Sequence, residues 1–437
     1  MSVQLDDRLS PFHSFHNRHG HQSDSLPVPR YTEQAQVSER VLHRSSTLPS
    51  TLANGRGVRD REYKYRTDNV EVDLGPCPWG LLYAAYGRGG TVRGTVTFLK
   101  KCSSVLQVTV TLQASLSITT SMHTMVSGFA SKPLITRKVT VFMADSSSSP
   151  SPVQGGTSFP FNLPFPETID DLDVSLPPSC SVFYPITAEI NYTVRIDVVR
   201  GKFYRHEMRT IPILYLPKSS PQLPPMVGMP WALSGDELPP GLKRVDVAGV
   251  WPDECHAHSA DRELATVELF LPDSPVFAAG DLIPLGLRIR CHSSPAIPKL
   301  LSGNIGVFLV KRKKVWVSEG RQISVKELAV GRVSDLHVNS MVEGAMYLTM
   351  ELQAGEVGTE LSWSVPGFID VEYIIRVIVR PPAYAKHLPV FKRDEVIQLC
   401  TDPYGSLTRE LLTMDGTPTP ALGLYSTPAA MSALRSS

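Results

Sequence analysis

A short proline–tyrosine motif is the clearest candidate for binding chemistry in this chain. Pro381 and Pro382 are followed by Ala383 and Tyr384, which makes a PPxY sequence. Two adjacent prolines favour a polyproline II conformation that fits the aromatic groove of a WW domain, and the tyrosine fills a second pocket. A second interpretation is that the prolines only end a strand and that Tyr384 packs on the sheet edge. Asp402-Pro403-Tyr404 is a degenerate second copy.

A second motif has the spacing of a phosphorylation-dependent site. Arg44, Ser45, Thr47 and Pro49 fit the pattern R-S-x-T-x-P. A phosphate on Thr47 would be held by the arginine cluster of a 14-3-3 protein, which makes this segment a candidate phospho-switch. The alternative is an ordinary solvated tail, because serine and arginine are abundant around the motif.

A run of four cations forms a third candidate. Lys311, Arg312, Lys313 and Lys314 separate the apolar segments GVFLV and VWVS. We expect the four side chains to cluster on a hairpin, where they could contact anionic lipid in a peripheral membrane contact, or an acidic patch on a partner. A solvated turn that protects a sheet edge from aggregation fits the same residues.

Metal, cofactor and catalytic signatures are missing from the sequence. The histidine cluster between residues 13 and 21 has no thiolate beside it, and Cys255-His256-Ala257-His258 with Cys291-His292 lacks a standard ligand spacing. The chain contains no GxSxG, HExxH or GxxxxGK[ST] sequence. We therefore expect no metal, no cofactor and no enzymatic activity.

Composition sets the broad class. The chain has 437 residues, with 43 Lys and Arg against 42 Asp and Glu, so no global field would attract nucleic acid. The 6 cysteines form no CxxC pair, which suits reduced thiols in the cytosol. The sequence lacks a signal-peptide pattern and a run of 18 apolar residues, and we expect a soluble cytoplasmic protein.

The first half predicts a β-sandwich after a tail. Residues 1–60 are polar and lack apolar periodicity, which predicts a disordered tail. Leu106–Ile118 and Ile186–Val198 alternate apolar and polar residues with a period of 2, the pattern of a half-buried strand. Residues 61–217 are therefore predicted as one antiparallel sandwich. Its shorter strands are expected at Thr91–Phe98, Ile135–Phe142, Thr157–Leu163 and Arg209–Leu216.

The second half predicts another sandwich. Residues 218–262 begin with a stretch dense in Pro and Gly and are predicted as a linker. Residues 263–380 again contain strand patterns, and residues 381–437, which include the PPxY motif, are predicted as a disordered tail. The fold class expected is all-β, with two tandem antiparallel β-sandwich domains between tails. The segments predicted as strands are ATVELFL, IPLGLRIR, NIGVFLVKRKKVWVS, VKELAVGRV, AMYLTMEL and DVEYIIRVIV.

Several segments resemble the arrestin-like family, and in particular the fungal alpha-arrestins. The resemblance lies in GGTVRGTVTF, in SFPFNLPFPE followed by LPPSC, and in YPITAEINYTVRIDVVRG leading to RTIPILYLP, with looser similarity at LSWSVPGFIDVEYIIRVIV. It spans roughly residues 63 to 380 and implies two arrestin-like sandwiches.

The resemblance also implies a function. Alpha-arrestins are non-catalytic adaptors that bring a HECT-type ubiquitin ligase to plasma-membrane transporters or receptors, whose cytosolic tails they bind and whose ubiquitination and endocytosis they promote. Pro381, Pro382 and Tyr384 would then bind the ligase's WW domains, and the protein would move from the cytoplasm to the plasma membrane and endosomes. The alternative is an arrestin-fold subunit of a retromer-like endosomal complex without ligase binding.

Overall fold

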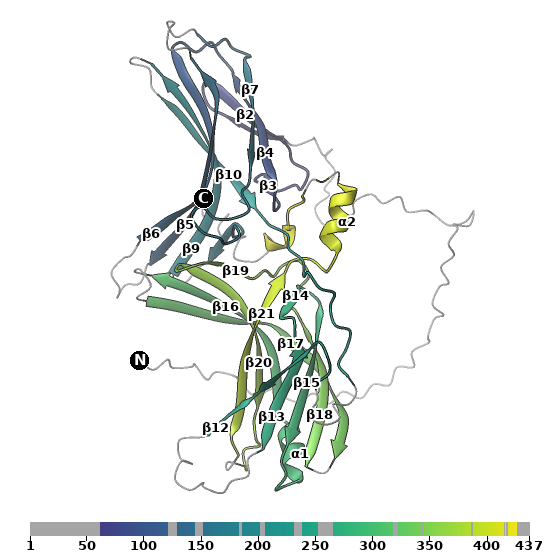
Figure 1. Cartoon of the computed structure of the whole chain (residues 1–437). Coiled ribbons are helices and arrows are strands. Elements are labelled where there is room, and N and C mark those ends of the chain that lie inside the picture. Colours follow the sequence, from purple (N-terminus) through teal and green to yellow (C-terminus); the bar gives the residue numbers. More distant parts are fainter. Residues whose placement is uncertain are drawn as a thin grey trace, which may run out of the picture. The chain divides into compact units, whose positions relative to one another are not determined.

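The structure is a computed structural model (Figure 1). The 14-3-3 candidate residues Arg44, Ser45, Thr47 and Pro49 lie outside the described residues, as does the whole tail predicted over residues 1–60. The described residues are 62–120, 129–144, 152–182, 186–201, 206–230, 238–251, 265–317, 322–342, 344–385, 388–414, 416 and 418–425.

Two sheets built from the first ten strands enclose a hydrophobic core. One sheet has the order β1-β2-β4-β7, and the other has the order β3-β10-β9-β5-β6 with β8 paired to β9. We call this unit the first sandwich. Its strands are β1 Glu62–Arg66, β2 Val70–Pro76, β3 Ala85–Tyr86, β4 Thr91–Phe98, β5 Val105–Thr120, β6 Phe129–Met143, β7 Ser158–Pro164, β8 Cys180–Val182, β9 Ile186–Arg200 and β10 Glu207–Tyr215.

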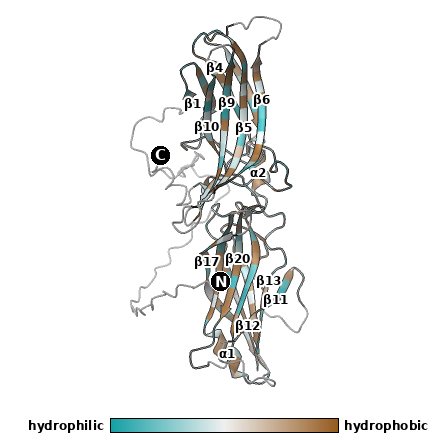
Figure 2. Cartoon of the chain, turned by 90° about the vertical axis from the view of Figure 1, so that its left-hand side faces the viewer, coloured by the Kyte–Doolittle hydropathy of each residue, from teal (hydrophilic) through white to brown (hydrophobic). Residues whose placement is uncertain are grey.

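The period-2 segments form the centre of the six-stranded sheet. β5 and β9 pair antiparallel along nearly their whole length, from Val105↔Arg200 to Thr120↔Ile186, and apolar residues alternate with polar ones along them (Figure 2). Every even-numbered residue from Val108 to Ile118, and from Ile186 to Val198, is buried. Both predicted strands are confirmed, although Leu106 at the start of the pattern is exposed.

The remaining strands form one large sheet. Its order is β11-β13-β15-β18-β17-β16-β20-β21-β12, with β14 beside β21 and β19 beside β20. The elements are β11 Leu242–Asp246, β12 Ala248–Val250, β13 Thr266–Pro272, β14 Val276–Ala278, β15 Leu282–Arg290, α1 Ala296–Ser302, β16 Ile305–Val317, β17 Gln322–Val342, β18 Ala345–Gln353, β19 Trp363–Val365, β20 Ile369–Val379, β21 Val390–Cys400, α2 Ser406–Thr413 and a 3-10 helix at Leu422–Leu424.

The large sheet folds over at β17. The first half of this strand pairs with β16, and from Val333 onward it pairs with β18. Gly331 stands at the change of partner, where a Cβ atom would lie 2.3 Å from the carbonyl oxygen of Gln353. Only glycine allows this close approach of two backbones.

The two outer strands of the large sheet are joined by a single residue, Val247. β11 pairs with β13 at one edge and β12 pairs with β21 at the other, and the Val247 N–H donates to the Val267 carbonyl at 2.8 Å. The sheet is therefore nearly barrel-shaped, and we call it the barrel-like sheet. The described chain thus confirms an all-β fold with large antiparallel sheets.

The structure differs from the predicted boundaries at two places. β11 and β12 lie inside residues 218–262, which the prolines and glycines had marked as linker. β21 lies beyond residue 380 and pairs with β20 from Tyr373↔Ile397 to Val379↔Phe391, so the prediction that the last strand ends at Arg380 and that residues 381–437 form a tail is wrong for this segment. The charged residues in the middle of β21 concealed its alternation.

Candidate functional site

The PPxY motif forms a turn between β20 and β21. The Ala385 N–H donates to the Pro382 carbonyl at 2.9 Å, which closes a β-turn with Ala383 and Tyr384 at its tip. We call Pro381–Ala385 the PPAY turn. The Tyr384 side chain is 79% exposed, so the prediction that it packs on the sheet edge is wrong.

A backbone hydrogen bond holds the PPAY turn at one end, and buried residues hold it at the other. The Arg380 N–H donates to the Asn304 carbonyl at 3.0 Å before the turn. After it, Ala385 and Leu388 are buried in the core of the barrel-like sheet. Because these contacts restrict residues 380–385, Tyr384 is presented on a restrained turn that follows β20.

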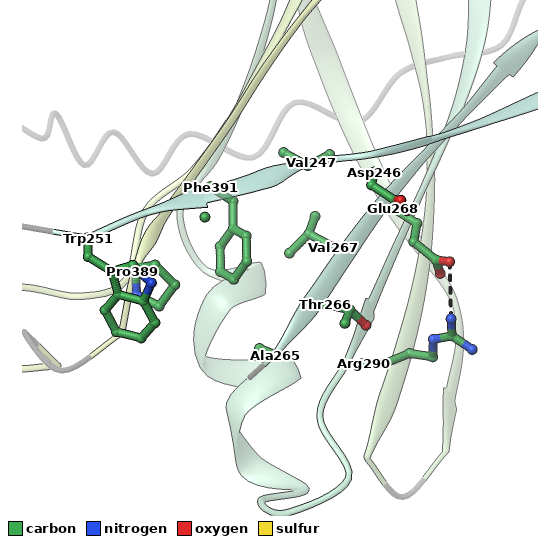
Figure 3. A pocket seen from close by; sticks show the side chains of 11 residues that line it. Asp246, Val247, Trp251, Ala265, Thr266, Val267, Glu268, Arg290, Pro389 and Phe391 are labelled. Carbon is green, nitrogen blue, oxygen red and sulfur yellow. Dashed lines mark hydrogen bonds and ion pairs between the residues drawn. The ribbon is translucent and has the colours of Figure 1, made fainter. Parts of the chain in front are cut away.

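A pocket of about 390 Å³ lies at the end of the same connection (Figure 3). Trp251 and Pro389 lie close together at one side, and Phe391 and Val267 add further apolar surface. On the opposite wall, Arg290 donates to Glu268 at 3.0 Å. This wall carries paired charges, whereas the side next to the PPAY connection is apolar.

The four-cation run lies within a strand and not at a turn. Lys311 to Lys314 lie in the middle of β16, which pairs with β17 on one side and β20 on the other. Successive side chains of a strand point to opposite faces, so Lys311 and Lys313 share a face with the buried Leu309 and Val315, while Arg312 and Lys314 point the other way. The expected cluster of four side chains is thus divided between two faces.

The outward cations are paired with carboxylates. Arg312 donates to Glu327 at 2.8 Å, Glu372 at 3.2 Å and Asp394 at 3.1 Å, and the Lys314 ammonium lies 2.7 Å from Glu372. These contacts offset the positive charge that an anionic surface would attract. Binding of this run to a membrane stays a prediction. The ion pairs of Arg312 and Lys314 do not favour it on the face of the sheet to which these two side chains point.

Lys311 is part of a buried group that the sequence did not predict. Its ammonium donates to the Glu360 carboxylate at 2.6 Å, and the Tyr373 hydroxyl donates to the same oxygen at 2.5 Å. Burial, together with the negative charge of Glu360, raises the pKa of Tyr373 well above its usual value. Glu360 is 49 residues from Lys311, and no local pattern marks it as a partner.

The degenerate motif at Tyr404 is also in a turn. The Ser406 N–H donates to the Pro403 carbonyl at 3.1 Å, and Tyr404 is 45% exposed. Only one proline precedes this tyrosine, so it offers a matched control for Tyr384.

Searches for metal-ligand groups and membrane-spanning helices, and comparisons with known proteins, assign no function to the chain. The described residues contain no group of three His, Cys, Asp or Glu side chains that could hold a metal ion, and none of their helices is long and apolar enough to cross a bilayer. The chain matches no protein-family model and no curated protein sequence.

Proposed function

We propose that the chain is a non-catalytic, arrestin-like adaptor that presents the PPAY turn to the WW domains of a HECT-type ubiquitin ligase. The observation that carries the proposal is the exposure of the Tyr384 ring at the tip of this turn. A WW domain must enclose the tyrosine ring and contact the prolines, and here the protein's own surface does not cover the ring.

The prolines of the motif are accessible as well. The hydrogen bond from the Ala385 N–H to the Pro382 carbonyl holds Ala383 and Tyr384 in a β-turn, so this bond must open for the motif to take the polyproline II conformation that a WW domain binds. Pro381 and Pro382 are only half-buried and leave part of their rings for a partner.

The cargo and the location of the adaptor follow from the resemblance to the alpha-arrestins. In this proposal the protein acts in the cytoplasm and is recruited to the plasma membrane and endosomes. It binds cytosolic tails of transporters or receptors there, and the ligase ubiquitinates these proteins before their endocytosis. The described fold, with large antiparallel β-sheets around two cores, is compatible with two arrestin-like sandwiches.

The test is a calorimetric titration of the full chain with a purified WW domain of a HECT ligase. We expect saturable binding by the wild type, and at least about tenfold weaker binding by Tyr384→Ala, because the tyrosine is the central anchor of such a ligand. Tyr404→Ala should bind as the wild type does.

Two outcomes would refute ligase docking at this turn. One is a wild-type chain that does not bind, and the other is a Tyr384→Ala variant that binds equally well. Substitution at so exposed a position should change stability by less than about 0.5 kcal/mol, so a thermal unfolding curve separates lost docking from lost folding.

A further inference from the structure

Lys313 is an inward-facing cation without a carboxylate partner. It is half-buried and points to the same face of β16 as Lys311, whose charge Glu360 neutralises. No ion pair or side-chain hydrogen bond of Lys313 occurs among the residues that the structure describes. A partly desolvated charge that stays unpaired is unfavourable.

The neighbours of Lys313 increase this cost. Lys326 lies directly opposite on β17, and like charges in facing positions of a sheet repel each other. Burial, and then the positive charge of Lys311, lowers the pKa of Lys313. Cys180 supplies no compensating anion, since burial raises the pKa of its thiol to about 12.

Lys313 lines a small pocket that contains hydrogen-bond donors. Lys311, Ser181 and Tyr425 share this pocket, and the hydroxyls of Ser181 and Tyr425 make no hydrogen bond to another described residue. Its volume is about 80 Å³, whereas pockets for drug-sized organic ligands measure about 300–1,000 Å³. The pocket therefore suits a compact anion.

We propose that this pocket, beside Lys313, Ser181 and Tyr425, is a binding site for a phosphate group. A phosphate supplies the missing negative charge and accepts hydrogen bonds from ammonium and hydroxyl donors, and lysine is a common phosphate ligand. The group could be free phosphate or the end of a small phosphomonoester. The site is separate from the PPAY turn and does not depend on the proposed ligase binding.

The test titrates the full chain, in phosphate-free buffer, with inorganic phosphate and with glycerol 3-phosphate, and uses sodium chloride of equal ionic strength as the blank. We expect one saturable site. Lys313→Met should weaken it by about tenfold or more, because it removes the central charge, while Lys313→Arg should retain binding. Lys392→Met is the matched control, since it removes an exposed lysine on β21.

The pattern of responses decides the proposal. Binding of inorganic phosphate alone supports a site for the free anion, and binding of both probes supports a site for a terminal phosphate. In the absence of phosphate, Lys313→Met should unfold at the same temperature as Lys392→Met or higher, because an unpaired charge is removed. No saturable binding, an equal response of Lys313→Met and wild type, or a Lys313→Met variant that unfolds well below the control would overturn the proposal.

Discussion

Replacing Glu360 with leucine should destabilise the barrel-like sheet strongly. The Lys311 and Glu360 side chains are 12% and 10% exposed, and their charged atoms lie 2.6 Å apart. Removing one partner of a buried ion pair leaves the other charge uncompensated, which costs about 3–5 kcal/mol. Tyr373 also loses the acceptor of its hydroxyl. We therefore expect the free energy of unfolding to fall by about 4 kcal/mol.

Urea unfolding of the full chain, followed by circular dichroism, measures this change as a lower midpoint. The control is the double variant Lys311→Met with Glu360→Leu, which replaces both charges with apolar groups. It should lie within about 2 kcal/mol of the wild type, because neither charge of the Lys311–Glu360 pair is left without its partner. A double variant as unstable as Glu360→Leu alone would refute the reasoning, since the loss would then come from packing and not from the charge left behind.

Two further predictions concern side chains that either lack or make specific hydrogen bonds in the structure. Tyr347 is buried and its hydroxyl has no hydrogen-bond partner among the described residues, so Tyr347→Phe should raise the free energy of unfolding by about 1 kcal/mol. Tyr373→Phe removes the hydrogen bond to Glu360 and should lower the free energy of unfolding by about 1–3 kcal/mol. A Tyr347→Phe variant less stable than the wild type would contradict this reasoning. Hydrogen bonds from Arg376 lower the pKa values of Glu327 and Asp394, so both carboxylates stabilise the fold above their unfolded pKa, and this contribution is lost as pH falls below about 4. Arg376→Met should therefore lose less stability than the wild type between pH 5 and pH 2, in urea unfolding at each pH, and equal losses would count against the assignment.

Strands whose apolar residues alternate regularly could be predicted from the sequence, whereas β21 could not. In β5 and β9 the residues between the buried apolar ones are mostly polar, among them Gln, Thr, Ser and Asn, so their alternation is visible locally. β21 has Lys392 to Glu395 in its centre, where Asp394 lies opposite Arg376 of β20. Such a strand depends on ion pairs with a distant segment, and a local apolar pattern does not reveal them.

The candidate functional site was also predictable from the sequence only in part. The PPAY motif could be found because all its residues are adjacent, although its place between two paired strands could not be. The four cations were expected to cluster on a hairpin because they lie between two apolar segments, whereas the prediction of NIGVFLVKRKKVWVS as one strand is confirmed by β16. The carboxylates that allow it to be a strand are Glu327, Glu360, Glu372 and Asp394, which lie 15 to 82 residues away.

Co-purification from cell extract tests the central claim most directly. The full chain and its Tyr384→Ala variant are isolated from the same cells, and the proteins bound to each are identified and quantified. We predict that a HECT ligase with WW domains accompanies the wild type and is lost from the variant. A stoichiometric complex with endosomal coat proteins, unchanged by Tyr384→Ala and without a ligase, would contradict the adaptor function and favour the retromer-like alternative.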